Sequence, residues 1–286
     1  MSVDGEAAWG LLGSSTDDLV TEETVRGAID AALAAGEIQQ EALGRLGRAD
    51  VRSKSSRRDL VTTVDVASER AIVSRLRALR HAHAIEAEEE VHDQEDGRPR
   101  WFVDPLDGTV NFFHGLPLFC VSIGLYRGPE PVLGVVHAPA LGETFVSAAG
   151  AGAHRLGEAI GDQRGLSVAS ETTQLADAVL ATGFPYRRGE LEHSNLENFS
   201  RFFHEVRGMR RMGSAALDLA FVAAGRLDGF WELHLSPFDV AAGAALVLEA
   251  GGVVTDARGG QEWLRGGSIV AGPGVLAEQM RGRIEA

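Results

Sequence analysis

The segment Trp101–His114, WFVDPLDGTVNFFH, decides how the rest of the chain is interpreted. A hydrophobic strand runs into Asp104, and Pro105 keeps that residue extended. Asp107 follows three residues on, and Gly108 permits a sharp turn, so two carboxylates can converge at the end of a strand. Carboxylate oxygens are the ligands that Mg²⁺ prefers. An ordinary Asp-Pro/Asp-Gly turn has the same composition, and this segment alone leaves both interpretations open.

The residues after the turn suit an anion. Gly108 and Thr109 could begin a short helix, and free backbone N–H groups at the start of a helix attract an anion such as phosphate. The segment therefore combines candidate metal ligands with a candidate phosphate contact.

Three further acidic residues lie at the ends of predicted elements. Asp65, in DLVTTVD, stands where a β-like stretch meets a helix start, and Glu88 follows a possible strand over 83–87. Asp239 falls in the first turn of the apolar helix in SPFDVAAGAALVLEAGG. Each has a purely structural alternative: a helix cap, a solvated glutamate run and compensation of a helix dipole, respectively.

Charge and composition limit the possible functions. The chain has 286 residues, 44% hydrophobic content and a net charge of −14, which argues against nucleic-acid binding. An acidic protein repels an anionic substrate unless a cation sits in the site, and bound divalent ions would supply that charge. Cys120 is the single cysteine and there is no long apolar run, so we expect a cytoplasmic protein without a membrane segment.

The order of predicted elements indicates a layered α/β (α+β) fold. Residues 1–15 are expected to form a flexible tail. An amphipathic helix is expected over Asp17–Gly47, with Thr16 as its N-cap, and a second helix over Val66–Arg80. From Trp101 short β-like runs predict an antiparallel sheet, and after about residue 175 strands and helices alternate. We therefore expect one catalytic domain over 16–286, with subdomains over roughly 16–175 and 176–286.

Taken together, the motifs resemble those of the inositol monophosphatase family, the magnesium-dependent, lithium-sensitive sugar phosphatases. Asp59–Asp65 looks like the family's D-L-V-T-x-x-D, and Ala87–Glu89 looks like its G-E-E. Asp104–Asn111 resembles D-P-[IL]-D-G-T-x-N, and Phe238–Gly243 resembles W-D-x-A-A-G. The motifs stand in family order, and the resemblance covers roughly residues 20–280. It implies a layered α/β/α/β sandwich and a homodimer.

The resemblance also implies a role for each matching residue. Asp65 and Thr109 would form a hydrogen-bonded pair beside the nucleophilic water, with Glu88 assisting. Two or three Mg²⁺ ions would be held by Glu88, Asp104, the backbone carbonyl of Leu106, Asp107 and Asp239. Phosphate and the hydroxyl-bearing part of the substrate would contact Gly108, Thr109, Gly213, Ser214, Ala215 and Glu232.

Three positions depart from the family pattern. Ala87 replaces the usual glycine before the paired glutamates, and a third glutamate follows, so Glu89 is an alternative ligand to Glu88. Val110 replaces a common threonine, and Phe238 replaces the usual tryptophan while keeping an aromatic wall. No carboxylate is lost, so we expect an active enzyme.

The expected reaction is hydrolysis of a small phosphomonoester by a metal-activated water, since no cysteine or serine lies in a recognisable nucleophile motif. Myo-inositol-1-phosphate is the favoured substrate. Fructose-1,6-bisphosphate, histidinol phosphate and 3′-phosphoadenosine phosphate stay open, with Arg187–Arg188 and Arg210–Arg211 as candidate contacts for extra charge. A partner-binding protein with a vestigial site is the alternative from another class.

Overall fold

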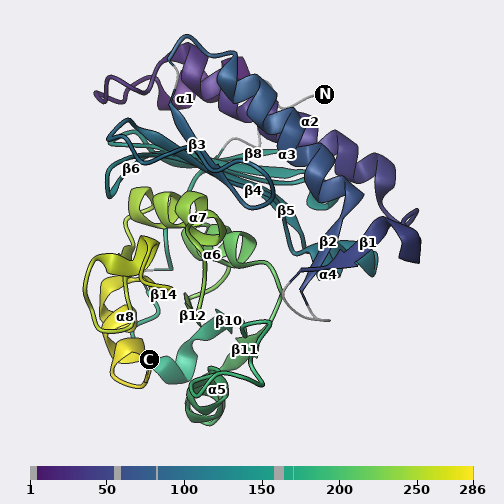
Figure 1. Ribbon diagram of the computed structural model, residues 1–286. Coiled ribbons are helices and arrows are strands. Elements are labelled where there is room, and N and C mark those ends of the chain that lie inside the picture. The colour runs from purple at the N-terminus through teal and green to yellow at the C-terminus, as the bar shows by residue number, and fades with distance from the viewer. Residues whose placement is uncertain (1–4, 55–58, 82, 158–163, 170, 286) are drawn as a thin grey trace.

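The computed structural model describes residues 5–54, 59–81, 83–157, 164–169 and 171–285. Three helices form an outer layer against one face of the first sheet (Figure 1): α1 (Gly5–Leu12), α2 (Glu22–Ala42) and α3 (Thr63–Arg77). Helix α2 begins later than the sequence predicts, because the Asp17 side chain accepts a hydrogen bond from the Leu19 N–H in a turn. Thr21, rather than Thr16, caps the helix by accepting from the Thr24 N–H.

Helix α1 corrects the expected flexible tail over residues 1–15. Ala8 and Leu12 are fully buried in the core between the outer helices and the first sheet. The Ser15 hydroxyl then donates to the Ala149 carbonyl oxygen at 2.5 Å. The apolar side chains of this segment are enough to dock it, despite the surrounding Gly, Ser and Asp. Residues 1–4 lie outside the described residues.

The first sheet has the strand order β3-β4-β5-β6-β7-β8-β9. The expectation of an antiparallel sheet holds from β4 onward, but β3 pairs with β4 in parallel. The loop over 88–99 carries the chain back to make that parallel pair. The strands are β3 (Ala84–Ala87), β4 (Arg100–Asp107), β5 (Cys120–Arg127), β6 (Glu130–Ala138), β7 (Glu143–Ala148), β8 (Gly152–Gly157) and β9 (Arg164–Gly165).

The second sheet has the order β11-β10-β12-β14-β13, with β10 parallel to β11 and β12, and β14 antiparallel to β12 and β13. Helices α6 and α7 lie between the two sheets, and α5 and α8 cover the far side of the second (Figure 1). The bounds are β10 (Val179–Thr182), β11 (Gly208–Arg210), β12 (Gly229–Leu233), β13 (Val253–Thr255), β14 (Ser268–Gly272), α5 (Leu196–Phe203), α6 (Ala215–Ala223), α7 (Pro237–Glu249) and α8 (Gly274–Arg281).

The layered α/β/α/β architecture is therefore confirmed, with a further helical layer formed by α5 and α8. Strands β1 to β9 precede residue 176 and β10 to β14 follow it. One hydrophobic core nevertheless includes residues of both sheets and of the helices between them, among them Phe102, Leu246 and Phe230. The remaining short elements are β1 (Val51–Ser53), β2 (Leu60–Thr62), α4 (Thr109–Phe113) and 3₁₀ turns at Arg48–Asp50, Pro139–Leu141, Leu175–Asp177 and Glu262–Leu264.

Helix α7 lies very close to the first sheet. A Cβ on Gly124 of β5 would stand 2.9 Å from the Ala241 Cβ, and one on Gly134 of β6 would stand 2.7 Å from the Ala242 carbonyl oxygen. These strand glycines let the helix backbone approach the sheet. The approach fixes where the first turn of α7 stands relative to β4 and β5.

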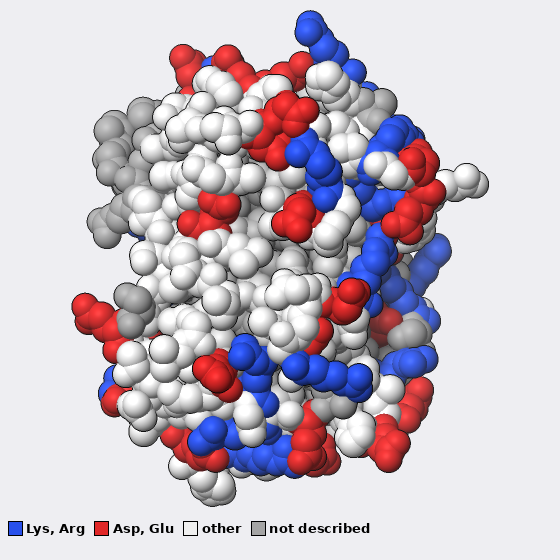
Figure 2. Space-filling view, turned by 90° about the vertical axis from the view of Figure 1, so that its left-hand side faces the viewer, with Lys and Arg blue, Asp and Glu red and all other residues white. Residues whose placement is uncertain are grey.

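Acidic and basic side chains are interspersed on the face shown in Figure 2, and they surround an area that has neither. This face therefore has no single acidic patch. In the described residues, no helix is both long and apolar enough to cross a membrane.

Candidate active site

The site begins at the end of β4, where the strand has a bulge. Asp104 is paired with Ser122 on β5, but Asp107 is paired with Cys120, so one more residue separates the aspartates than separates their partners. Pro105 cannot donate a hydrogen bond to the ladder, and a bulge re-aims the side chains around it. Asp104 is buried and accepts a hydrogen bond from the Leu106 N–H at 2.9 Å.

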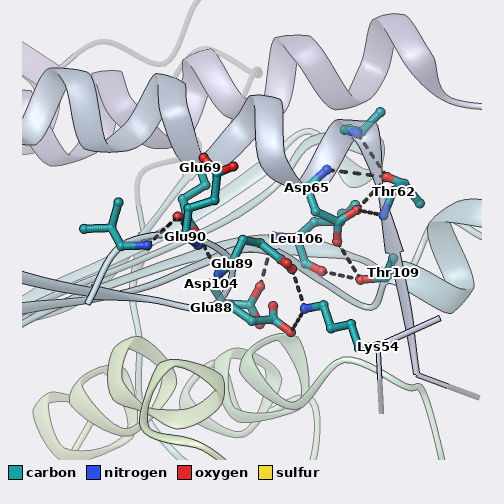
Figure 3. A network of polar contacts seen from close by, with 12 residues as sticks. Lys54, Thr62, Asp65, Glu69, Glu88, Glu89, Glu90, Asp104, Leu106 and Thr109 are labelled. Carbon is teal, nitrogen blue, oxygen red and sulfur yellow. Dashed lines mark hydrogen bonds and ion pairs between the residues drawn. The ribbon is translucent and has the colours of Figure 1, made fainter. Parts of the chain in front are cut away.

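Gly108 makes the turn that the sequence predicts. Its φ of +96° lies in the left-handed region, and a Cβ there would stand 2.9 Å from the Leu118 carbonyl oxygen. The turn opens the short helix α4 and directs Thr109 inward. The Thr109 hydroxyl donates to Asp65 Oδ1 at 2.9 Å and lies 3.1 Å from the Leu106 carbonyl oxygen (Figure 3). The structure thus brings together the three residues Asp65, Leu106 and Thr109.

Asp65 caps helix α3 and also contacts Thr109. Its Oδ2 accepts from the Thr62 N–H at 2.9 Å and from the Thr62 hydroxyl at 2.5 Å, which caps α3. Its other oxygen receives the Thr109 hydroxyl. Burial raises the pKa of Asp65 to about 6, although the hydrogen bonds from Thr62 and Thr109 counteract part of that effect.

Glu88 follows directly after β3 and is held beside β4. Its N–H donates to the Val103 carbonyl oxygen at 3.1 Å, and its side chain contacts the Lys54 ammonium at 2.8 Å. Lys54 also contacts Glu89 at 2.5 Å (Figure 3). The negative charge of Glu88 contributes to the raised pKa values of Asp104, Asp107 and Asp239. Of the two adjacent glutamates, only Glu88 is among the described residues that line the neighbouring cavity.

Asp107 and Asp239 come from the two halves of the chain. Asp107 Oδ2 accepts from the Ser214 hydroxyl at 2.8 Å and from the Ala216 N–H at 2.7 Å, both at the start of α6. Asp239 Oδ2 accepts from the Ser236 N–H at 2.7 Å, which caps α7. The N-terminal ends of both central helices therefore meet β4 at this site.

The electrostatics of this cluster suit a divalent cation. Burial, followed by repulsion from neighbouring carboxylates, raises the pKa of Asp104 and Asp239 well above the ordinary value. Burial raises the pKa of Asp107 to about 7, although hydrogen bonds from Ser214 and Ala216 oppose it. Buried oxygens that repel one another are the donor set that a hard cation stabilises.

The side chains nevertheless do not form a closed cage. No group of three or more His, Cys, Asp or Glu side chains in the described residues has the arrangement of a complete metal site. The donors would have to close around an ion by changing side-chain rotamers. Two cations, Lys54 and Arg211, lie beside the cluster. Burial acts to lower the pKa of Lys54, but Glu88 and Glu89 outweigh it and raise that pKa. Arg211 acts to lower the pKa of Asp107.

A cavity of about 470 Å³ opens next to these carboxylates. Its lining contains the expected substrate wall, Gly213, Ser214, Ala215 and Glu232, together with Glu88, Asp107 and Asp239. Burial raises the pKa of Glu232 to about 8, although Arg211 opposes this. Gly108 and Thr109 are not among the described residues that line the cavity, so the expected phosphate contact through them stays a prediction.

Sequence reasoning missed three residues that hold the site together. Gln39 on α2 is buried and donates to the Pro105 carbonyl oxygen at 2.7 Å, inside the Asp104–Asp107 segment. Lys54 bridges the paired glutamates. Glu69 on α3 accepts hydrogen bonds from the loop after Glu88. The only signal for Glu69 was its spacing, four residues after Asp65 on the same predicted helix.

This layered fold is shared with solved sugar phosphatases, which are phosphoric monoester hydrolases, and the carboxylates gather where its two halves meet. Residues 21–285 match the model of the inositol monophosphatase family. The chain belongs to this family, whose members depend on a metal.

Individual relatives agree with that membership. An inositol-1-monophosphatase of Mesorhizobium japonicum is 43% identical over 87% of this chain and 91% of its own length. A Pseudomonas aeruginosa protein named Nus factor SuhB is 43% identical over 86% of this chain and 89% of its own length. The solved inositol monophosphatase of Anabaena shares 39% identity with a TM-score of 0.78, covering 90% of this chain and 93% of that one.

Proposed function

We propose that this enzyme hydrolyses a small polyol phosphate, with myo-inositol-1-phosphate as the first candidate, through a metal-activated water and without a covalent intermediate. The observation that carries the proposal is the contact between the Thr109 hydroxyl and Asp65, next to the Leu106 carbonyl and the buried aspartates. It joins residues 44 positions apart in the sequence, and neither helix capping nor turn formation requires that contact.

The metal ligands in this proposal are Glu88, Asp104, the Leu106 carbonyl, Asp107 and Asp239, holding two or three Mg²⁺ ions. When bound, Mg²⁺ lowers the pKa of a water and offsets charge on the phosphate. The raised pKa values of the aspartates support a cation here, because ionised carboxylates are disfavoured in this cluster without one. Glu88 would assist by orienting a water next to Asp104.

Thr109 and Asp65 form a relay for the proton of the attacking water. Because the Thr109 hydroxyl donates to Asp65, a lone pair of its oxygen is free to accept a hydrogen bond from water. The water oxygen forms a bond to phosphorus, the ester P–O bond breaks, and the released alkoxide takes a proton from solvent. A pKa of about 6 suits Asp65 as the proton acceptor near neutral pH.

The wall opposite the carboxylates suits a polyol. Glu232 is buried against Gly183, where an added Cβ would clash with Glu232 Oε2. A carboxyl group so placed can form hydrogen bonds with substrate hydroxyls, and Gly213 and Ala215 line the same cavity. We propose that these residues select the alcohol half of the substrate.

The test is phosphate release from myo-inositol-1-phosphate by the purified enzyme, with Mg²⁺, with EDTA, and with Mg²⁺ plus Li⁺. We expect turnover with Mg²⁺, none with EDTA, and inhibition by Li⁺. Turnover that survives exhaustive metal removal would refute the metal-dependent mechanism.

A bisphosphate is the second candidate, because two arginines line the cavity. Arg187 and Arg211 both stand in its wall, whereas Arg188 and Arg210 do not. A second phosphate group would find its counter-charge there. Comparing kcat/KM for fructose-1,6-bisphosphate and myo-inositol-1-phosphate in the wild type and in Arg187→Gln separates the two: a bisphosphatase would lose activity only toward the bisphosphate.

We further propose a cytoplasmic homodimer.

Some relatives carry the name Nus factor SuhB, so a partner-binding role is the alternative to catalysis for this chain. The retention of every acidic motif supports an enzyme. Absence of Mg²⁺-dependent phosphate release from all four candidate substrates would favour the binding role.

A further inference from the structure

Glu69 is a fully buried glutamate on α3 whose carboxylate faces the backbone of a neighbouring loop. Its Oε2 accepts from the Glu89 N–H at 2.7 Å. Its Oε1 accepts from the Glu90 N–H at 2.7 Å and from the Val91 N–H at 3.0 Å (Figure 3). One side chain thus receives three consecutive backbone N–H groups.

Three successive N–H groups that point to one place form an anion-binding concavity. Here the protein fills it with its own carboxylate. Hydrogen bonds to a charged acceptor are short and strong, and they compensate for burying the charge. The loop conformation and the Glu69 side chain therefore depend on each other.

This loop carries Glu88. The Glu88 N–H donates to the Val103 carbonyl oxygen, and the Ala87 N–H donates to the Val91 carbonyl oxygen at 2.7 Å. The backbone of Glu88 is therefore held on one side by β4 and on the other by residues that Glu69 binds. Among the described residues, no other side chain accepts hydrogen bonds from the N–H groups of all three of Glu89, Glu90 and Val91.

Helix α3 connects this loop to the rest of the site. Asp65 and Glu69 are four residues apart, so they lie on the same face of one helix. Asp65, in the first turn of α3, contacts Thr109, and Glu69, about one turn further along, binds the Glu88 loop. A rigid helix of this kind sets the distance between the Thr109 pair and Glu88.

We propose that Glu69 is a positioning residue that holds Glu88 in place to bind Mg²⁺. The inference rests on the proposed role of Glu88 as a metal ligand. Groups that orient metal ligands typically change metal affinity by roughly 10- to 100-fold when they are removed. A role in stability alone would leave metal affinity unchanged in the folded variant.

The test measures Mg²⁺ binding by calorimetry on the metal-free full chain, without substrate, and amide hydrogen exchange at residues 89–91. The key variant is Glu69→Gln, in which an N–H₂ group replaces one acceptor oxygen. The matched control is Glu90→Gln, because Glu90 lies on the same loop but its exposed side chain pairs with Arg70 of α3. Glu88→Gln tests the underlying metal ligand.

For Glu69→Gln we expect a dissociation constant for Mg²⁺ raised roughly 10- to 100-fold, together with faster exchange at residues 89–91. Glu90→Gln should match the wild type in both measurements. If Glu69→Gln does not fold, Glu69→Asp, which keeps both oxygens on a shorter side chain, carries the same expectation.

Wild-type Mg²⁺ affinity in the folded Glu69 variant, while Glu88→Gln binds weakly, would overturn the positioning role and leave the proposed function intact. Wild-type affinity in Glu88→Gln as well would overturn both, because Glu88 would then not be a ligand. The two failures are thereby distinguishable.

Discussion

Replacing Asp107 with asparagine should make the metal-free protein more stable and the enzyme far less active. The asparagine side-chain oxygen can keep both hydrogen bonds that Asp107 Oδ2 accepts, from Ser214 and from Ala216. The start of α6 then stays in place. What the variant loses is a negative charge inside a cluster of carboxylates.

The magnitude follows from the Asp107 pKa, which burial raises from its ordinary value of 3.8 to about 7. The folded state therefore binds a proton more tightly than the unfolded chain, and stability falls as pH rises from about 4 to about 7. A difference of about 3 between the two pKa values corresponds to about 4 kcal/mol at pH 8, as an upper value. Asp107→Asn avoids this loss because asparagine does not ionise.

The assay is urea unfolding in EDTA at pH 5 and pH 8. We expect the variant to exceed the wild type by up to about 4 kcal/mol at pH 8 and by less at pH 5. With saturating Mg²⁺, its turnover should be lower by several orders of magnitude, where each factor of ten is about 1.4 kcal/mol. Asp177→Asn, in an exposed ion pair with Arg207, is the control and should change neither quantity. Near wild-type activity in Asp107→Asn, with no gain in stability at pH 8, would refute the reasoning.

Three further substitutions test other parts of the site. Thr109→Val removes the hydroxyl that donates to Asp65, so kcat should fall by about 10²-fold or more, and Thr109→Ser should restore most of it in the same steady-state assay. Gly108→Ala should destabilise the fold by roughly 1–3 kcal/mol in urea unfolding. Gly115→Ala should cost less, because Gly115 also has a positive φ but nothing lies within 4 Å of an added Cβ there. Glu232→Gln should raise KM for a polyol phosphate roughly tenfold, whereas p-nitrophenyl phosphate, which lacks polyol hydroxyls, should show no change in KM.

Local patterns were enough to predict most elements, but each acidic residue taken alone had a structural alternative. The helix around Asp239 and the strand into Asp104 each show a clear hydrophobic pattern with a capping or turn residue at the end. The ordered motifs then indicated which segments meet. The structure brings Asp65 and Thr109 into contact and sets Glu88, Asp107 and Asp239 around one cavity.

What the sequence did not predict depends on contacts between distant segments. Gln39 binds a backbone carbonyl 66 residues away, and Glu69 binds backbone N–H groups about 20 residues away, so no side-chain motif marks either contact. The parallel pairing of β3 with β4 is likewise not visible in local alternation. Helix α1 was missed because its polar flanks outweighed two apolar residues that tertiary packing buries.

The core shared by both sheets has a consequence for how the enzyme cycles. Residues such as Phe102 and Phe230, from opposite sheets, belong to one continuous interior around α6 and α7. Separating the sheets would expose that interior to water, so a hinge movement that opens one half away from the other would cost hydrophobic free energy. We therefore expect substrate entry and product release to depend on side chains and loops of the cavity wall, such as the segment Phe184–Arg187 in its lining.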